Sequence, residues 1–174
     1  IDTLSLEDAV LLLKEIGKIE DNLYAASSDV CELVGCLPLA IQIAGHYLSC
    51  TETNVTEYLE ILRKTPLNIL GQGNRRLQSI PILLEKSLNQ VSEVERKVLG
   101  VCGVIAYASF SSEFIEFSLN ISKMQLTSSL GELINYGLII KIGKRYKVSH
   151  ALIHTYARER LDVDLSVIDS IYEY

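Results

Sequence analysis

The stretch Leu138–Ser149, which reads LIIKIGKRYKVS, decides the fold that we expect for this chain. β-branched residues alternate on both sides of the letters GKR, and this pattern predicts a β-hairpin. The next segment, SHALIHTYARERL (149–161), returns to helical spacing with Ser149 as a candidate cap. Helices followed by one hairpin form the element order of a winged-helix domain.

The residues just upstream of the hairpin supply the helices that such a domain needs. Ser92 and Glu95 form a capping-box pattern, Ser122 is a second cap, and Gly137 is placed to end the last helix before the hairpin. The four expected helices span 79–90, 92–106, 111–119 and 122–137. The second half of the chain therefore predicts a winged helix.

The first half predicts a small helical bundle whose key feature is the apolar run DVCELVGCLPLAIQIAGHYL (29–48). Gly35 suits the left-handed position just beyond a helix end, and Pro38 suits the first turn of a new helix because its missing N–H costs nothing there. The run therefore divides into two helices. The four expected helices span 5–17, 27–35, 38–50 and 53–66; the second is capped by Ser27 or Ser28 and the last by Asn54 with Glu57.

The domain organisation follows from the least periodic interior segment, LNILGQGNRRLQS (67–79). We place a boundary near Gly73, which gives a helical subdomain over 1–72, a winged-helix subdomain over 73–161 and the start of a linker over 162–174. The predicted fold class is mainly α, a helical bundle followed by a winged helix with one hairpin.

Composition excludes several classes of protein. The chain has 174 residues, 48% of them apolar, and a formal net charge of −6, which fits folded domains and argues against a general nucleic-acid binder. Its longest uncharged apolar stretch, VLGVCGVIAYASF, is too short to span a bilayer. The four cysteines lack CxxC spacing, so we expect reduced, buried thiols of a cytoplasmic protein.

No enzyme site emerges from the motifs. The chain has no GxxxxGK[ST] loop, and GQGNRR favours a connection over a phosphate site. His150 and His154 have the spacing of two zinc ligands, but Ala151 stands where HExxH has its catalytic glutamate. The simpler interpretation is that His150 helps to start the last helix and His154 lies on a partly exposed face. We expect no catalytic residue and no metal.

A winged helix raises the question of DNA binding. The candidate recognition helix, KMQLTSSLGELINYG, carries one lysine and one glutamate, which is little charge for phosphate contacts. The hairpin carries four cations that could contact nucleic acid or a protein partner, or belong to a solvated turn. They are Lys141, Lys144, Arg145 and Lys147. A DNA-binding regulator and a nucleotide-independent interaction module both remain alternatives.

Two segments, GCLPLAIQIAG and YKVSHALIHTYARERL, together resemble signature segments of the NB-ARC or STAND signal-transducing ATPases. That family includes the apoptosome scaffold, plant disease-resistance receptors and many bacterial regulators. Its members carry a GLPLA motif in a helical subdomain and an MHD or HxLVRDYA motif at the end of a winged helix. The resemblance covers residues 1–161 and includes IDTLSLEDAVLLL and the intervening SIPILLEKSLNQVSEVERKVLGVCGVIAYASFSSEFI.

The resemblance implies a regulatory part of an ADP/ATP-dependent switch. A P-loop core would lie upstream of Ile1, sensor repeats would follow Tyr174, and the activated protein would form a homo-oligomer. Pro38 matches the family proline beside the adenine and ribose, with Leu37 and Leu39 shaping an apolar wall. His150 matches the histidine that reaches the β-phosphate of ADP in the resting state. Without the core, we expect weak nucleotide binding or none.

Two positions depart from the family pattern. Cys36 replaces the second glycine before LPLA, where we expect a small side chain to cost little. Ala151 replaces the aspartate after the motif histidine. This replacement favours a prokaryotic-type regulator, and the resting state would be held without that carboxylate.

Overall fold

The computed structural model describes residues 3–64, 79–164 and 166–169. It divides into two compact units, Ile1–Ser87 and Leu88–Tyr174. The boundary expected at Gly73 lies outside the described residues, and the helix expected to open the second domain is grouped with the first unit. The fold class is confirmed: the chain is mainly helical and has one small antiparallel hairpin.

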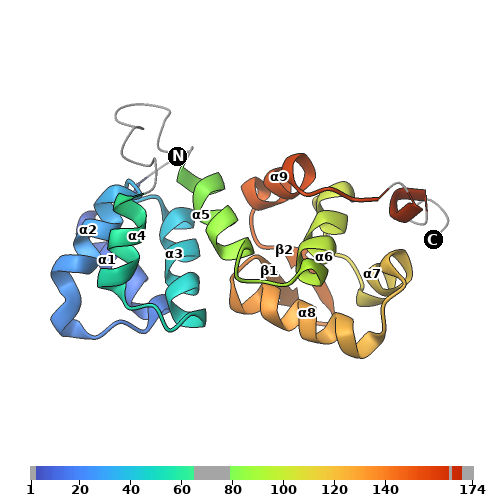
Figure 1. Ribbon diagram of the computed structural model, residues 1–174, viewed down its shortest axis with the longest axis horizontal. Helices are drawn as coiled ribbons and strands as arrows, with labels where there is room; N and C mark the ends of the chain where they lie inside the picture. Colours follow the sequence, from blue (N-terminus) through green and yellow to red (C-terminus); the bar gives the residue numbers. More distant parts are fainter. Residues whose placement is uncertain (1–2, 65–78, 165, 170–174) are drawn as a thin grey trace. The chain divides into compact units, whose positions relative to one another are not determined.

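The helices are labelled as in Figure 1. Those in the first unit are α1 (Leu6–Gly17), the 3-10 turn η1 (Asp21–Leu23), α2 (Tyr24–Leu33), α3 (Pro38–Cys50), α4 (Val55–Arg63) and α5 (Ser79–Leu88). Those in the second unit are α6 (Glu93–Val104), α7 (Ser112–Leu119), α8 (Lys123–Asn135) and α9 (Ala151–Arg160). The strands are β1 (Ile139–Ile142) and β2 (Arg145–Val148).

The first unit is a bundle in which α1 packs against α2 and α3, and α2 packs against α4. Leu13, Ile41 and Leu62 are fully buried, and each such side chain contributes about 1.5–3 kcal/mol of hydrophobic stabilisation. A Cβ added at Gly45 would lie 2.8 Å from the Cβ of Ile16. The glycine therefore allows α3 to approach α1 closely.

The break between α2 and α3 follows the local rules. The Gly35 N–H donates to the Glu32 carbonyl (3.0 Å) and the Cys36 N–H donates to the Cys31 carbonyl (2.9 Å), the pair of bonds of a Schellman motif. Gly35 has φ 73°, and Pro38 opens α3 in its first turn. Both expectations are confirmed.

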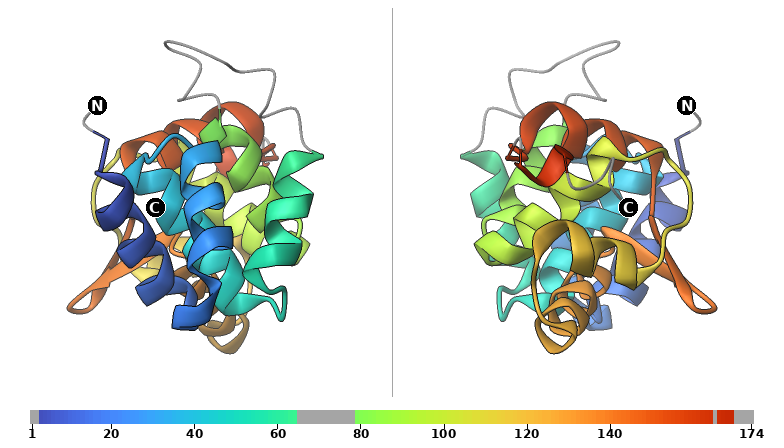
Figure 2. Two further views of the ribbon diagram at one scale, coloured as in Figure 1. Left: turned by 90° about the vertical axis from the view of Figure 1, so that its left-hand side faces the viewer. Right: turned by 90° about the vertical axis from the view of Figure 1, so that its right-hand side faces the viewer.

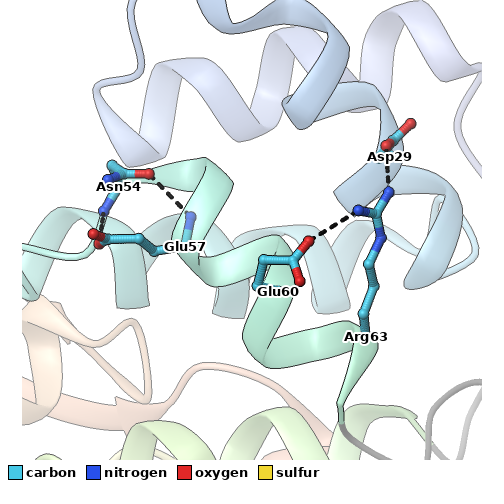
Figure 3. Close-up of polar contacts among 5 residues, drawn as sticks. All are labelled: Asp29, Asn54, Glu57, Glu60 and Arg63. Atoms are coloured by element: carbon cyan, nitrogen blue, oxygen red, sulfur yellow. Dashed lines mark hydrogen bonds and ion pairs between the residues drawn. The ribbon is translucent and has the colours of Figure 1, made fainter.

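Helix α4 begins at the predicted capping box, drawn in Figure 3. The Asn54 Oδ1 accepts from the N–H of Glu57 (3.0 Å), and the Asn54 N–H donates to the Glu57 carboxylate (3.3 Å). At the other end, Arg63 donates to Glu60 (3.0 Å) and to Asp29 of α2 (2.8 Å). Pro66, which we expected to mark the end of this helix, lies outside the described residues.

The second unit has the element order of a winged helix, and Figure 2 shows its hairpin, coloured orange, projecting beyond the unit's own helices. β1 pairs with β2 so that Ile139 faces Val148, and both side chains are buried. The loop turns at Gly143, whose φ is 61°, as a two-residue hairpin requires. Phe110 pairs with the other edge of β2 through two backbone bonds to Tyr146 of 2.8 and 2.9 Å.

The last helix, α9, approaches α6 more closely than any side chain would allow. A Cβ added at Gly103 would lie 2.5 Å from the Arg158 nitrogen and 2.8 Å from the Ala157 carbonyl carbon. Ala157 is itself fully buried. Gly103 is therefore required by contact with the backbone of α9.

A buried carboxylate joins α6 to α8. The Ser129 hydroxyl of α8 donates to Glu95 at 2.7 Å, while the Ser92 N–H donates to the same carboxylate at 2.8 Å in the predicted capping box. Burial raises the pKa of Glu95, but the hydrogen bonds from Ser92 and Ser129 outweigh burial and leave the pKa below its ordinary value of 4.5. The ionised group therefore stabilises the fold.

Two predicted serine caps were wrong. α2 begins at Tyr24, directly after η1, so Ser27 lies inside the helix and its hydroxyl donates to the Leu23 carbonyl at 2.9 Å. At α9, Ser149 is not the cap, because its hydroxyl donates to the Gly137 carbonyl at 2.6 Å. His150 caps α9 instead, which confirms the interpretation that this histidine helps to start the helix. The carbonyl that accepts from the serine hydroxyl is four residues back in the chain for Ser27 and twelve residues back for Ser149, and neither serine is the cap that the local pattern assigned.

Gly103→Ala should destabilise the protein by about 1–3 kcal/mol, because the added methyl group forces α9 away from α6. The matched control is Gly131→Ala in α8, where a Cβ would meet nothing within 4 Å. That change should stabilise by about 0.5–1 kcal/mol, because alanine favours a helix interior. Urea unfolding followed by circular dichroism measures both, and equal effects would refute the close approach.

Glu95→Gln should lower the free energy of unfolding at pH 7 by about 1–2 kcal/mol, because a neutral amide replaces an ionised acceptor. The pKa of Glu95 is lowered in the folded state, so its contribution is present above pH 4.5 and is lost as pH falls below it. The difference between wild type and variant should therefore shrink on acidification. Glu93→Gln, at an exposed residue of the same helix turn, is the control, and a pH-independent difference would contradict the assignment.

Candidate functional site

The three residues expected around an adenine lie together at the start of α3, with different exposure. Leu37 is the residue before the helix and Pro38 is its first residue. Leu37 and Leu39 are 3% and 9% exposed, whereas Pro38 is partly exposed. Of the three, only Pro38 presents appreciable surface to a ligand, and the leucines lie in the core beside it.

The residue before this group carries backbone strain. Cys36 has φ 52°, in the left-handed region where a side chain is unfavourable by roughly 1–2 kcal/mol. Its carbonyl accepts from the Leu4 N–H at 3.0 Å, and its own N–H closes the Schellman motif, so the conformation is held from both sides. Our expectation that cysteine costs little considered only side-chain size, whereas this position also requires a left-handed backbone angle, which glycine adopts without strain.

His150 is an exposed helix cap with one ring nitrogen in use. Its Nδ1 accepts from the Leu152 N–H at 3.1 Å. An accepting Nδ1 carries no proton, so the proton of the neutral ring is on Nε2. Within the described residues, the Ala151 N–H has no acceptor, and the first turn of α9 has no acidic residue. The start of α9 therefore offers donors to an anion.

The second histidine of the HALIH segment is structural. His154 is 8% exposed and its Nε2 lies 2.8 Å from the Ile105 carbonyl oxygen at the end of α6. Its ring lies 5.3 Å from the ring of Tyr107. The expected partly exposed position was wrong, because His154 lies on the face of α9 that packs against α6.

Three of the four cations of the β-hairpin, Lys141, Lys144, Arg145 and Lys147, contact side chains or backbone of their own unit. Lys141 lies over the Tyr146 ring (5.7 Å to its centroid) and Lys147 over the Tyr107 ring (4.4 Å). Arg145 donates to Ser109 through two nitrogens. Among the described residues only Lys144 of the four lacks a partner. Lys141 and Tyr146 face each other across the hairpin, whereas the contacts of Lys147 with Tyr107 and of Arg145 with Ser109 join residues far apart in sequence, which no local pattern could have identified.

The remaining candidate chemistry is absent from the described part of the chain. None of the four cysteines forms a disulfide; Cys31 and Cys102 are buried as expected, but Cys36 and Cys50 are only half-buried, so the expectation of four buried thiols was wrong for these two. Burial, with a smaller effect of Cys36, raises the pKa of Cys31 to about 12, and burial also raises the pKa of Cys102, which makes both poor nucleophiles. Over residues 3–64, 79–164 and 166–169, no three His, Cys, Asp or Glu side chains could hold a metal ion.

Within the same described residues, no helix has the length and apolar character that crossing a membrane demands. In the comparisons with known proteins, no family model matches the chain, and no curated protein matches it.

Cys36→Gly should stabilise the protein by about 0.5–1 kcal/mol, because relief of the left-handed strain exceeds the added entropy of the unfolded chain. Gly35→Ala, at φ 73° one residue earlier, is the opposite control and should destabilise by about 1 kcal/mol. Urea denaturation under reducing conditions compares the three proteins. A loss of stability in Cys36→Gly would show that the thiol contributes more than its backbone angle costs.

Proposed function

We propose that this chain is the regulatory part of an ADP/ATP-dependent molecular switch of the NB-ARC or STAND type. The observation that carries the proposal is the exposed cap of α9, where His150 binds its own helix through Nδ1 and keeps Nε2 for a ligand. A phosphate suits this position because it accepts from both the ring and the helix N-terminus.

The resting state would be held by nucleotide. In this proposal the phosphates of ADP bind a P-loop core upstream of Ile1, and His150 donates to the β-phosphate. Pro38 packs beside the adenine and ribose, with its rigid backbone and partly exposed ring at the start of α3. Exchange for ATP would favour an open, oligomeric state if the two nucleotides differ in affinity for the two arrangements.

The sequence has no P-loop, so no catalysis is proposed for these residues alone. Residue 151 is alanine, and a carboxylate there would lie at the N-terminus of α9 and would compete with an anion for the same donors. The phosphate therefore meets an uncharged helix start in this chain.

In the chain extended upstream to include the core, His150→Ala and His150→Ser should both release ADP at least about tenfold faster than wild type, because each loses a hydrogen bond to a charged group. Serine is a good helix cap, so His150→Ser should keep wild-type stability, whereas His150→Ala should lose about 1 kcal/mol. Stopped-flow release of a fluorescent ADP analogue and urea unfolding measure the two effects.

The Ser variant separates the two roles of His150. If His150→Ser releases ADP at the wild-type rate, His150 is only a helix cap. Absence of any bound adenine nucleotide in the extended protein would refute the proposed function as a whole.

A further inference from the structure

A cavity in the second unit remains without a role. Its volume is about 470 Å³, within the range of small-molecule sites. The lining residues come from the segment after α6, the start of α7 and the beginning of β2. They are Ile105, Ala106, Ala108, Ser109, Phe110, Ser111, Phe114 and Arg145.

The apolar part of this cavity is built on a fixed backbone. Phe110 is paired with Tyr146 of β2 by two backbone hydrogen bonds, and the two rings stack with centroids 6.2 Å apart. Phe110 is 5% exposed, so its position is set by the core. The Ile105 carbonyl is held by His154, which fixes the start of the same segment. The apolar wall of the cavity is therefore already formed before a ligand binds.

The polar part of the cavity consists of donors. The Arg145 Nε donates to the Ser109 hydroxyl oxygen (3.1 Å) and its Nη2 donates to the Ser109 carbonyl (2.5 Å). Of the five guanidinium N–H groups, three therefore have no acceptor among the described residues. The hydroxyl proton of Ser109 has none there either. Ser109 holds the guanidinium in one place and leaves Nη1 and Nη2 able to bind a carboxylate with two parallel bonds.

No acidic residue among the lining side chains neutralises Arg145. Glu113, close in sequence on α7, does not line the cavity, and its pKa is held below the ordinary value by its own backbone N–H first, then by Ser111, Lys123 and Ser112. Glu113 therefore already serves as the anion at the start of α7. The one cation of the cavity is left for a ligand.

We propose that this cavity binds a small organic carboxylate with an apolar tail, its carboxylate on Arg145 and Ser109 and its tail against Ile105, Phe110 and Phe114. The carboxylate could belong to a free acid or to the C-terminus of a peptide ending in an apolar residue. The site is independent of the proposed nucleotide switch, since neither Pro38 nor His150 lines it.

The test uses 3-phenylpropionate as the probe and the neutral 3-phenylpropionamide, of the same shape, as its control. Titration of the chain, followed by amide chemical shifts in NMR spectra, should give a dissociation constant of about 1 mM for the acid, the range expected for so few atoms. The amide should bind at least about tenfold more weakly, because it cannot form charge-assisted bonds with the guanidinium. Equal binding of acid and amide, or no binding of the acid at about 20 mM, would overturn the proposal.

Two variants locate the site, with one charge-matched control. Arg145→Gln should weaken the acid about tenfold or more, and Ala108→Leu, which fills the cavity and keeps the arginine, should do the same. Lys144→Gln removes an equal charge from the adjacent wing residue and should change affinity less than about twofold. Wild-type affinity in Arg145→Gln or Ala108→Leu would overturn the site, and circular dichroism checks that each variant is folded.

A second arm distinguishes the two sources of carboxylate. Tighter binding of the tripeptide Gly-Gly-Phe than of 3-phenylpropionate supports a peptide C-terminus, and the reverse order supports a free acid. His150→Ser should leave the affinity for either probe unchanged, because His150 does not line the cavity. The carboxylate site and the nucleotide switch are therefore tested independently.

Discussion

The second unit depends on the contact between α9 and α6 at Gly103. Because no side chain separates the helices, the α9 backbone lies directly on α6, and this places His154 within hydrogen-bond distance of the Ile105 carbonyl. That bond holds the end of α6, from which the chain runs to Phe110 and its pairing with β2. The same segment lines the cavity beside Arg145, and α9 begins next to His150, four residues before His154.

Local signals predicted most of the helices and the hairpin. The capping boxes at Asn54 and Ser92, the Schellman motif at Gly35 and the first-turn proline at Pro38 all formed as expected, since each depends on residues a few positions apart. One error occurred where a distant group competed for the same atom. Ser149 bonds to a carbonyl twelve residues away and leaves the cap of α9 to His150.

The candidate sites were less predictable than the fold. Sequence alone selected His150 and Pro38, but it could not show that His150 uses Nδ1 for its own helix or that Leu37 and Leu39 are buried. It also missed that Cys36 adopts a left-handed angle, because small size was taken as the relevant property. The pairing of Arg145 with Ser109 spans 36 residues, and only the folded hairpin brings it about.

The four cations of the β-hairpin are interpreted differently once the fold is known. Lys141 and Lys147 lie over tyrosine rings of their own unit, and Ser109 fixes the guanidinium of Arg145, which keeps N–H groups for an anion. The proposed nucleotide switch rests instead on the exposed donors at the start of α9.

The most direct test of that account is the nucleotide content of the natural protein purified without added nucleotide. Denaturation followed by chromatography of the released small molecules should yield ADP at about one equivalent per chain, as a tightly closed resting state requires. The central claim would be contradicted if the folded natural protein released no adenine nucleotide and also bound none when incubated with ADP.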